Sequence, residues 1–105
     1  MIELKNKKFD LFGTEWHIKF EEVVKDPQDN HEIYGMTYRG ATNEVIIAKT
    51  INGKNISEKE IKITLLHELM HAIFTTGQYS MSNEDEPLVE WTARCLNQLI
   101  NKNII

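Results

Sequence analysis

The chain has 105 residues and a mass of 12.3 kDa, with 41% hydrophobic residues, 27% charged residues and a formal net charge of −4. This length fits one domain, and the acidic balance argues against a nucleic-acid binder held by phosphate contacts. The single cysteine, Cys95, cannot form an internal disulfide, and no apolar run suits a signal peptide or a membrane span. We therefore expect a cytoplasmic protein that binds neither nucleic acid nor membranes.

The first half of the chain alternates polar and apolar residues in the manner of β-strands. Trp16, Ile18 and Phe20 are separated by polar residues, which predicts a half-buried strand over 16–20. Turn chemistry predicts a loop, and further apolar runs predict three more strands; the loop is expected at 26–30 and the strands at 2–9, 33–38 and 44–48. Residues 1–50 are thus expected to form a three- or four-stranded, mostly antiparallel sheet.

The second half of the chain carries helical periodicity and two capping signals. Ser57-Glu58-Lys59-Glu60 is a capping box that opens a first helix, and Gly77 is expected to end it. Asn83 is expected to cap a second helix, with Pro87 in or near its first turn. The helices are predicted at 57–76 and 83–101. No repeat or linker divides the chain, so we predict a single α+β domain over 1–105.

The first predicted helix contains the motif His67-Glu68-Leu69-Met70-His71. Histidines four residues apart lie on the same helix face, so that both imidazoles can reach one tetrahedral metal ion. Glu68 is placed to act on a water at that ion rather than to bind the ion itself. The motif predicts a Zn²⁺ site with Glu68 as general base. The alternative is an accidental motif in an interaction domain without a metal.

A catalytic zinc takes a third protein ligand and keeps one position open. The candidates are His17, His31, Glu84, Asp85, Glu86 and Glu90. Glu90 is favoured because it lies in mid-helix beside Ala93, where the second helix should face the first, and Glu86 is the next candidate. Glu90 could instead pair with Arg94 one turn further on, as residues at this spacing often do.

The combination of the motif with Glu90, nineteen positions after its second histidine, resembles the gluzincin arrangement. It is most similar to small stand-alone zincin-like proteins of phages and prophages, which are related to the ImmA/IrrE-type metallopeptidases. In that family a Leu-His-Glu-Leu-x-His helix precedes a Glu-x-x-Ala helix, and Leu66 and Ala93 fill the matching places over residues 61–99. One departure concerns the thermolysin-like pattern, which has Asp four residues after the ligand Glu, where this chain has Arg94.

The resemblance implies a zinc-dependent metallopeptidase, a hydrolase that acts on a peptide or protein substrate. Zn²⁺ would be held by His67, His71 and Glu90, and Glu68 would be the general base for a metal-activated water that attacks the peptide bond. A rival interpretation belongs to another class, a non-catalytic zinc-bound module that acts through protein–protein interaction.

The resemblance also implies how a substrate binds. In related zincins the peptide adds to an edge strand above the active-site helix, and residues 44–48 are expected to be that strand. Tyr38 and Tyr79 are candidate donors for the oxyanion. Thr64 and Asn97 are candidate acceptors for the remaining imidazole nitrogens.

Overall fold

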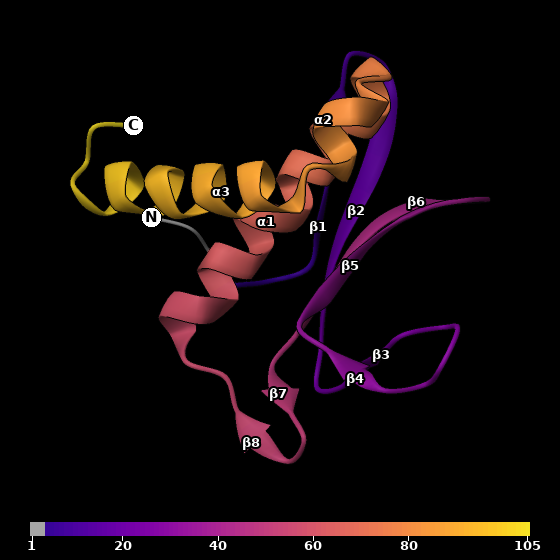
Figure 1. Ribbon diagram of the computed structural model, residues 1–105, viewed down its shortest axis with the longest axis vertical. Coiled ribbons are helices and arrows are strands. Elements are labelled where there is room, and N and C mark those ends of the chain that lie inside the picture. The colour runs from indigo at the N-terminus through magenta and orange to yellow at the C-terminus, as the bar shows by residue number, and fades with distance from the viewer. Residues whose placement is uncertain (1–3) are drawn as a thin grey trace.

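The computed structural model describes residues 4–105, and whatever the sequence predicts for residues 1–3 lies outside the described part. The strands are β1 (Lys7–Leu11), β2 (Thr14–Glu21), β3 (Val24–Lys25), β4 (Glu32–Ile33), β5 (Gly35–Arg39), β6 (Asn43–Ala48), β7 (Thr50–Ile51) and β8 (Lys54–Asn55). The helices that follow are α1 (Glu58–Gly77), α2 (Ser80–Glu84) and α3 (Glu86–Asn101) (Figure 1).

Four of the strands form one mixed sheet in the order β1-β2-β6-β5, which bears out the α+β class. The pairs β1–β2 and β5–β6 are antiparallel, as predicted for most of the sheet, whereas β2 and β6 are parallel. The parallel pair arises because β5 runs back along the sheet before the chain enters β6. This register places Ile18 beside Val45 and Phe20 beside Ile47, so the apolar side chains of both central strands share one face.

Two predicted strands differ from those found. The strand predicted at 2–9 is found as β1, Lys7–Leu11. The strand predicted at 33–38 is interrupted at Tyr34, so that β4 pairs with β3 and β5 pairs with β6. The main-chain oxygen of Tyr34 instead accepts a 2.9 Å hydrogen bond from the amide of Ala48. The strands predicted over 16–20 and 44–48 are confirmed as β2 and β6.

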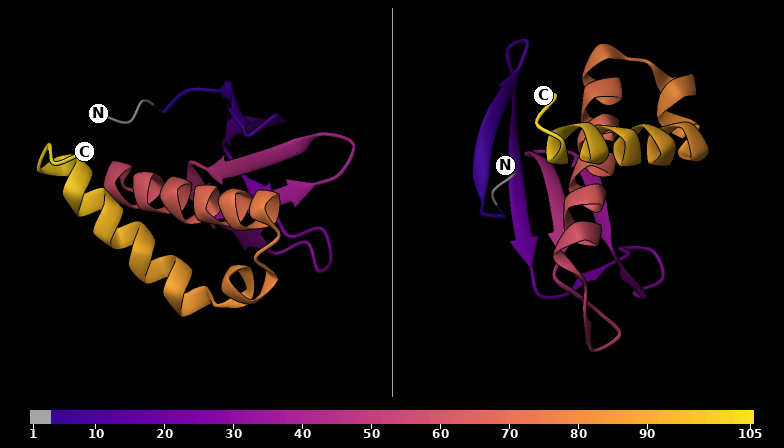
Figure 2. Two further views of the ribbon diagram at one scale, coloured as in Figure 1. Left: turned by 90° about the horizontal axis from the view of Figure 1, so that it is seen from above. Right: turned by 90° about the vertical axis from the view of Figure 1, so that its left-hand side faces the viewer.

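The helices lie on one face of the sheet (Figure 2). α1 packs on the central strands and buries an apolar cluster with them, made of Trp16, Ile18, Val45, Ile47, Ile61, Leu65 and Ala72. Trp16 is fully buried, and its indole Nε1 donates a 3.0 Å hydrogen bond to Thr76 Oγ1 near the end of α1. This bond and the apolar cluster fix the orientation of α1 on the sheet.

The predicted start of α1 is confirmed, and its predicted end is displaced by one residue. Ser57 is the N-cap, and its hydroxyl oxygen accepts a 3.2 Å hydrogen bond from the Glu60 amide. The residue in the left-handed conformation is Gln78, with φ of 63°, while Gly77 is the last helical residue. The Gln78 and Tyr79 amides satisfy the last carbonyls of the helix.

The second predicted helix is divided into α2 and α3. Asp85 rather than Asn83 is the N-cap of α3, because its carboxylate accepts a 3.1 Å hydrogen bond from the Leu88 amide, and Pro87 lies in the first turn as predicted. α3 packs on α1 through Ala93, which is fully buried. No helix within residues 4–105 is long and apolar enough to cross a membrane. A cytoplasmic location stays a prediction.

Candidate metal centre

The two motif histidines lie one turn apart on α1, and their ring centroids are 5.0 Å apart. Their Nε2 atoms converge on one carboxylate at the start of α3: His67 Nε2 is 3.1 Å from Glu86 Oε2, and His71 Nε2 is 2.8 Å from Glu86 Oε1. One ligand atom from each of these three residues lies within 4.8 Å of the other two. The centre therefore brings together two imidazoles from α1 and a carboxylate from α3.

The other ring nitrogens also face oxygen atoms. His67 Nδ1 is 2.9 Å from Glu90 Oε1, and His71 Nδ1 is 2.7 Å from Asn83 Oδ1. A neutral imidazole carries one N–H and can donate to only one of its two oxygen neighbours. A cation between the Nε2 atoms and Glu86 removes this conflict, since each Nδ1–H then donates outward while each Nε2 lone pair faces the ion. The donor set fits a metal ion on these grounds.

The spacing of the three ligand groups is close to that around a tetrahedral metal ion. Tetrahedral zinc with bonds of about 2.0 Å to nitrogen and oxygen separates its ligand atoms by about 3.3 Å. The two nitrogen–oxygen distances at Glu86, 3.1 and 2.8 Å, are a few tenths of an ångström shorter. Glu86 is 60% exposed at its side chain and lies in the first turn of α3, so a small rotamer change accommodates the ion.

Glu90, the ligand favoured by the sequence, lies one turn further along α3 and contacts His67 from the opposite side of the ring. Its Oε2 accepts a 2.7 Å hydrogen bond from Arg94 Nε, the pairing that the sequence left as the alternative. Burial pushes the pKa of Glu90 upward, but the hydrogen bonds from His67 and Arg94 outweigh it and leave the pKa below its usual range. The structure thus brings Glu86, rather than Glu90, to both Nε2 atoms, and ligation by Glu90 stays a prediction.

Glu68 is held between α1 and the sheet. It is 8% exposed, and its carboxylate Oε1 lies 2.7 Å from the hydroxyl of Thr37 in β5. The same hydroxyl is 2.9 Å from the main-chain oxygen of Glu68. Burial raises the pKa of Glu68, although Thr37 and the two motif histidines oppose the rise. Glu68 therefore has a fixed position beside the imidazoles, in surroundings where burial disfavours its charged form.

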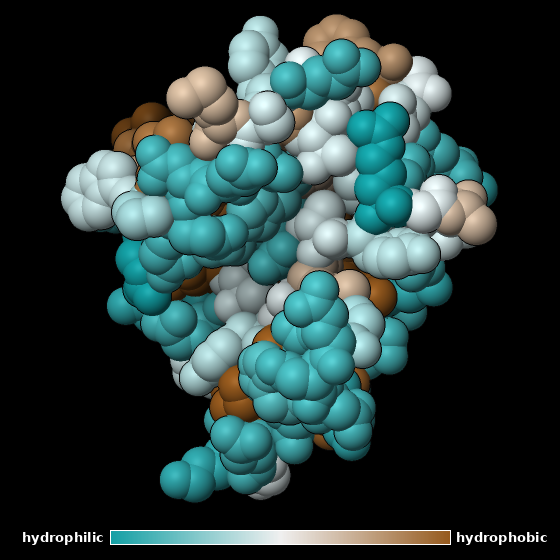
Figure 3. All heavy atoms as spheres, turned by 45° about the vertical axis from the view of Figure 1, so that its right-hand side comes forward, coloured by the Kyte–Doolittle hydropathy of each residue, from teal (hydrophilic) through white to brown (hydrophobic). Residues whose placement is uncertain are grey.

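A cleft of about 660 Å³ opens beside these groups, between α1, α3 and the β7–β8 hairpin. His67, Glu68 and Glu90 line it, together with Tyr34 and Gly35 at the start of β5. Figure 3 shows the surface hollowed above the lobe at the bottom that carries β7 and β8, with hydrophilic side chains on both sides. The cleft therefore reaches His67 and Glu68, whereas His71 and Glu86 are not among its lining residues.

The prediction that residues 44–48 form the edge strand to which a substrate adds is wrong. β6, which contains residues 44–48, is a central strand between β2 and β5. The edge strand beside the cleft is β5, because the β5–β6 hairpin places β5 outermost. Gly35 lets β5 approach α1 closely: a Cβ at this position would lie 2.9 Å from Thr64 Cγ2 and 3.3 Å from Glu68 Cγ.

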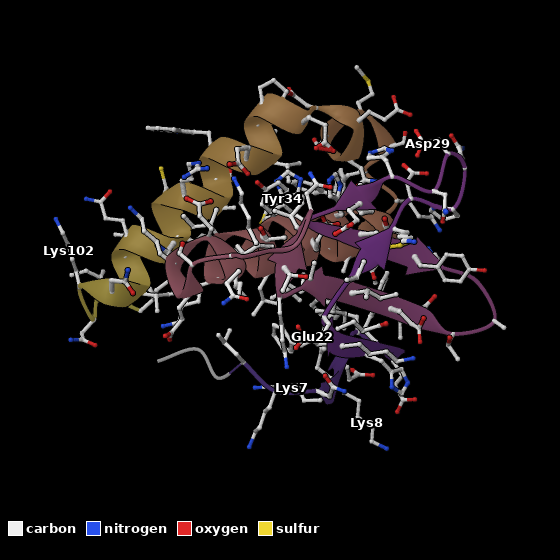
Figure 4. All side chains as sticks on the ribbon, turned by 90° about the horizontal axis from the view of Figure 1, so that it is seen from below. Lys7, Lys8, Glu22, Asp29, Tyr34 and Lys102 are labelled. Atoms are coloured by element: carbon white, nitrogen blue, oxygen red, sulfur yellow. The ribbon has the colours of Figure 1, made fainter. Side chains whose placement is uncertain are left out.

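Several residues predicted as ligands or donors lie elsewhere. His17 contacts Glu15 on β2, and His31 contacts Asp29 in the β3–β4 loop (Figure 4). The predicted oxyanion donors Tyr38 and Tyr79 are not among the residues that line the cleft.

The structure adds three residues to the site that the sequence did not assign to it, namely Tyr34, Thr37 and Asn83. Tyr34 is the tyrosine that lines the cleft. Asn83 and Glu90 are the acceptors at the imidazole Nδ1 atoms, the role for which Thr64 and Asn97 were candidates. Alternation along β5 could have pointed to Thr37, but the sequence holds no signal that pairs Asn83 with His71.

Comparison of the chain with protein-family profiles, with curated proteins and with solved structures gives no match. The functional argument rests on the motif and on the geometry of the residues around it.

Proposed function

We propose that this protein is a zinc-dependent metallopeptidase whose fold is a minimal gluzincin-like zincin. The observation that carries the proposal is the convergence of His67 Nε2 and His71 Nε2 on one carboxylate of α3, at distances of 3.1 and 2.8 Å, beside the buried Glu68. An open cleft at this point gives a peptide access to Glu68. A phage or prophage origin is part of the same proposal.

His67, His71 and a carboxylate of α3 would hold the ion. Glu86 is supported by its contacts with both Nε2 atoms, and Glu90 by the sequence resemblance. With Glu86 as ligand an acid, Glu90, stands four residues later, where the thermolysin-like pattern has Asp, whereas Val89 takes the place of Ala in the Glu-x-x-Ala match. Glu90 would accept the proton of His67 Nδ1 and orient the ring.

Bound zinc supplies a Lewis acid for the scissile carbonyl and makes water acidic enough to act as a nucleophile near neutral pH. Glu68 takes the proton of the attacking water and delivers it to the leaving amine. Thr37 keeps the carboxylate of Glu68 in place through the 2.7 Å contact with Oε1. Tyr34, in the wall of the cleft, is the candidate donor to the developing oxyanion.

The substrate would lie along the free edge of β5 as an added strand. One side of β5 is paired with β6, and the edge strand borders the cleft at Gly35. Main-chain hydrogen bonds to this edge would hold the peptide regardless of its side chains.

The variant Glu68→Gln tests the proposal. Glutamine has the same shape and still offers Thr37 an oxygen acceptor, so we expect a folded protein with about one zinc ion per chain, as in the parent. Cleavage of an unstructured protein such as casein, followed by mass spectrometry, should fall by at least about 10²-fold. Equal cleavage by the variant and the parent would refute the role of Glu68. A zinc-bound parent without cleavage would support the non-catalytic module instead.

A further inference from the structure

A second pocket, of about 300 Å³, adjoins the cleft where the first turns of α1 lie against the C-terminal half of α3. Three cationic and three amide side chains line it, namely Lys59, Arg94, Lys102, Asn97, Gln98 and Asn101. No acidic side chain lines it, although the chain carries a net charge of −4. This local excess of positive charge attracts an anion.

The cations of this basic pocket are only partly compensated. Arg94 is shared between Glu90 and Glu60, whose Oε2 lies 3.6 Å from Arg94 Nη2. Lys59 and Lys102 form no ion pair within residues 4–105. Lys102 is the C-cap of α3 (Figure 4), and it lines the pocket together with Arg94, eight residues earlier on that helix.

Asn97 supplies an independent sign that the pocket takes a ligand. Its side chain is 4% exposed, and its Oδ1 atom has no hydrogen-bond partner among the described residues. A buried polar atom without a partner is costly, and native proteins rarely keep one without a reason. A ligand that brings an N–H donor together with a negative charge would satisfy Asn97 and the cations at once.

We propose that this basic pocket binds the carboxylate of a peptide, with a peptide N–H donated to Asn97. Hydrogen phosphate could also donate to Asn97 through its O–H, but the position of the pocket beside the cleft favours a peptide. The pocket is a direct neighbour of the cleft, since Ile63 and Arg94 line both. The identification of this peptide as a substrate rests on the proposed peptidase function, whereas the carboxylate site itself does not.

The position of the pocket predicts where the peptide is cut. Lys59 precedes His67 on α1 by eight residues, which is about 12 Å along the helix axis. An extended peptide covers that distance with three or four residues at about 3.3 Å each. Peptides bound by their C-terminal carboxylate would therefore be cleaved about three or four residues before their end.

Binding of matched peptides tests the site. In the zinc-loaded Glu68→Gln variant, N-acetyl-tetraalanine with a free carboxylate should bind about tenfold more tightly than its C-terminal amide, as expected for a charge-assisted contact. Lys59→Gln combined with Lys102→Gln should reduce this preference to less than about twofold. The matched control is Lys8→Gln combined with Lys25→Gln, which makes the same change in net charge at two exposed lysines and should keep the preference.

Three results would overturn the proposal. The first is equal binding of acid and amide, or no binding of either up to about 10 mM. The second is a preference that survives the Lys59 and Lys102 substitutions. The third is displacement of the acid by inorganic phosphate at equal concentration, which would mark a general anion site. A preserved acid preference without cleavage by the parent would refute the peptidase function and leave the carboxylate site standing.

Discussion

Separate replacement of Glu86 and Glu90 decides which carboxylate of α3 completes the metal centre. Structural zinc sites contribute about 10 kcal/mol of binding free energy; on that scale each of three protein ligands accounts for about 3 kcal/mol, or about 200-fold in affinity. Loss of an acceptor that only orients a ligand histidine costs about 10- to 100-fold. Glu90 is 41% exposed and contacts one imidazole. Its replacement should therefore lower zinc affinity by an amount near the lower limit of this range, about tenfold.

Zinc affinity can be measured by competition with a chromophoric chelator near pH 7.5. Glu86→Gln should lower the affinity by about 200-fold and Glu90→Gln by about tenfold. Glu84→Gln, which removes an exposed acid at the end of α2, is the matched control and should change it little. The opposite order, with a large loss in Glu90→Gln and almost none in Glu86→Gln, would refute the geometric argument and restore Glu90 as the ligand.

Two further predictions concern the start of β5. Gly35→Ala should lower the free energy of unfolding by about 1–3 kcal/mol in urea titrations. The new Cβ would lie 3.0 Å from the main-chain oxygen of Ile46 and also against Thr64. An unchanged urea midpoint would contradict this close packing. Tyr34→Phe should lower kcat by about 10- to 10²-fold with little change in KM if its hydroxyl donates to the oxyanion. A change in KM alone would assign Tyr34 to substrate binding.

Local patterns predicted the elements well where neighbours in sequence decide the structure. Alternation over 16–20 and the apolar run at 44–48 correctly predicted β2 and β6, and Ser57 correctly predicted the start of α1. The order of the strands was beyond such patterns, because the parallel β2–β6 pair joins residues far apart in the chain. The interruption at Tyr34 likewise depends on a contact with Ala48 in β6.

The division of the second predicted helix also depends on tertiary contacts that local sequence patterns do not contain. Asn83 and Asp85 are both good N-cap residues, so the sequence offers two starts for α3. Tertiary contacts select between them: the side chain of Asn83 faces His71, and Asp85 is left to cap α3. The competing role of Asn83 at the imidazole appears only once α1 and α2 are placed together.

The two imidazoles could be predicted from the sequence because helical periodicity alone puts them on one face. The third ligand depends on how α3 lies against α1, which Ala93 fixes by packing on Ile63 and Leu66. Glu86 and Glu90 are one turn apart on the same face of α3, and a shift of one turn exchanges their roles. No property of either residue by itself distinguishes them.

One face of α3 connects the metal centre to the basic pocket. Glu86, Glu90, Arg94, Asn97 and Asn101 recur at spacings of three and four residues and so lie along that face. Charge along it changes from acidic beside the histidines to basic at the far end. A peptide carboxylate is attracted at the basic end, so this helix would orient the substrate with its C-terminus away from the metal. Since the helical rise is fixed, the distance from the carboxylate to the cleavage point would be set by α3 and α1 rather than by a loop.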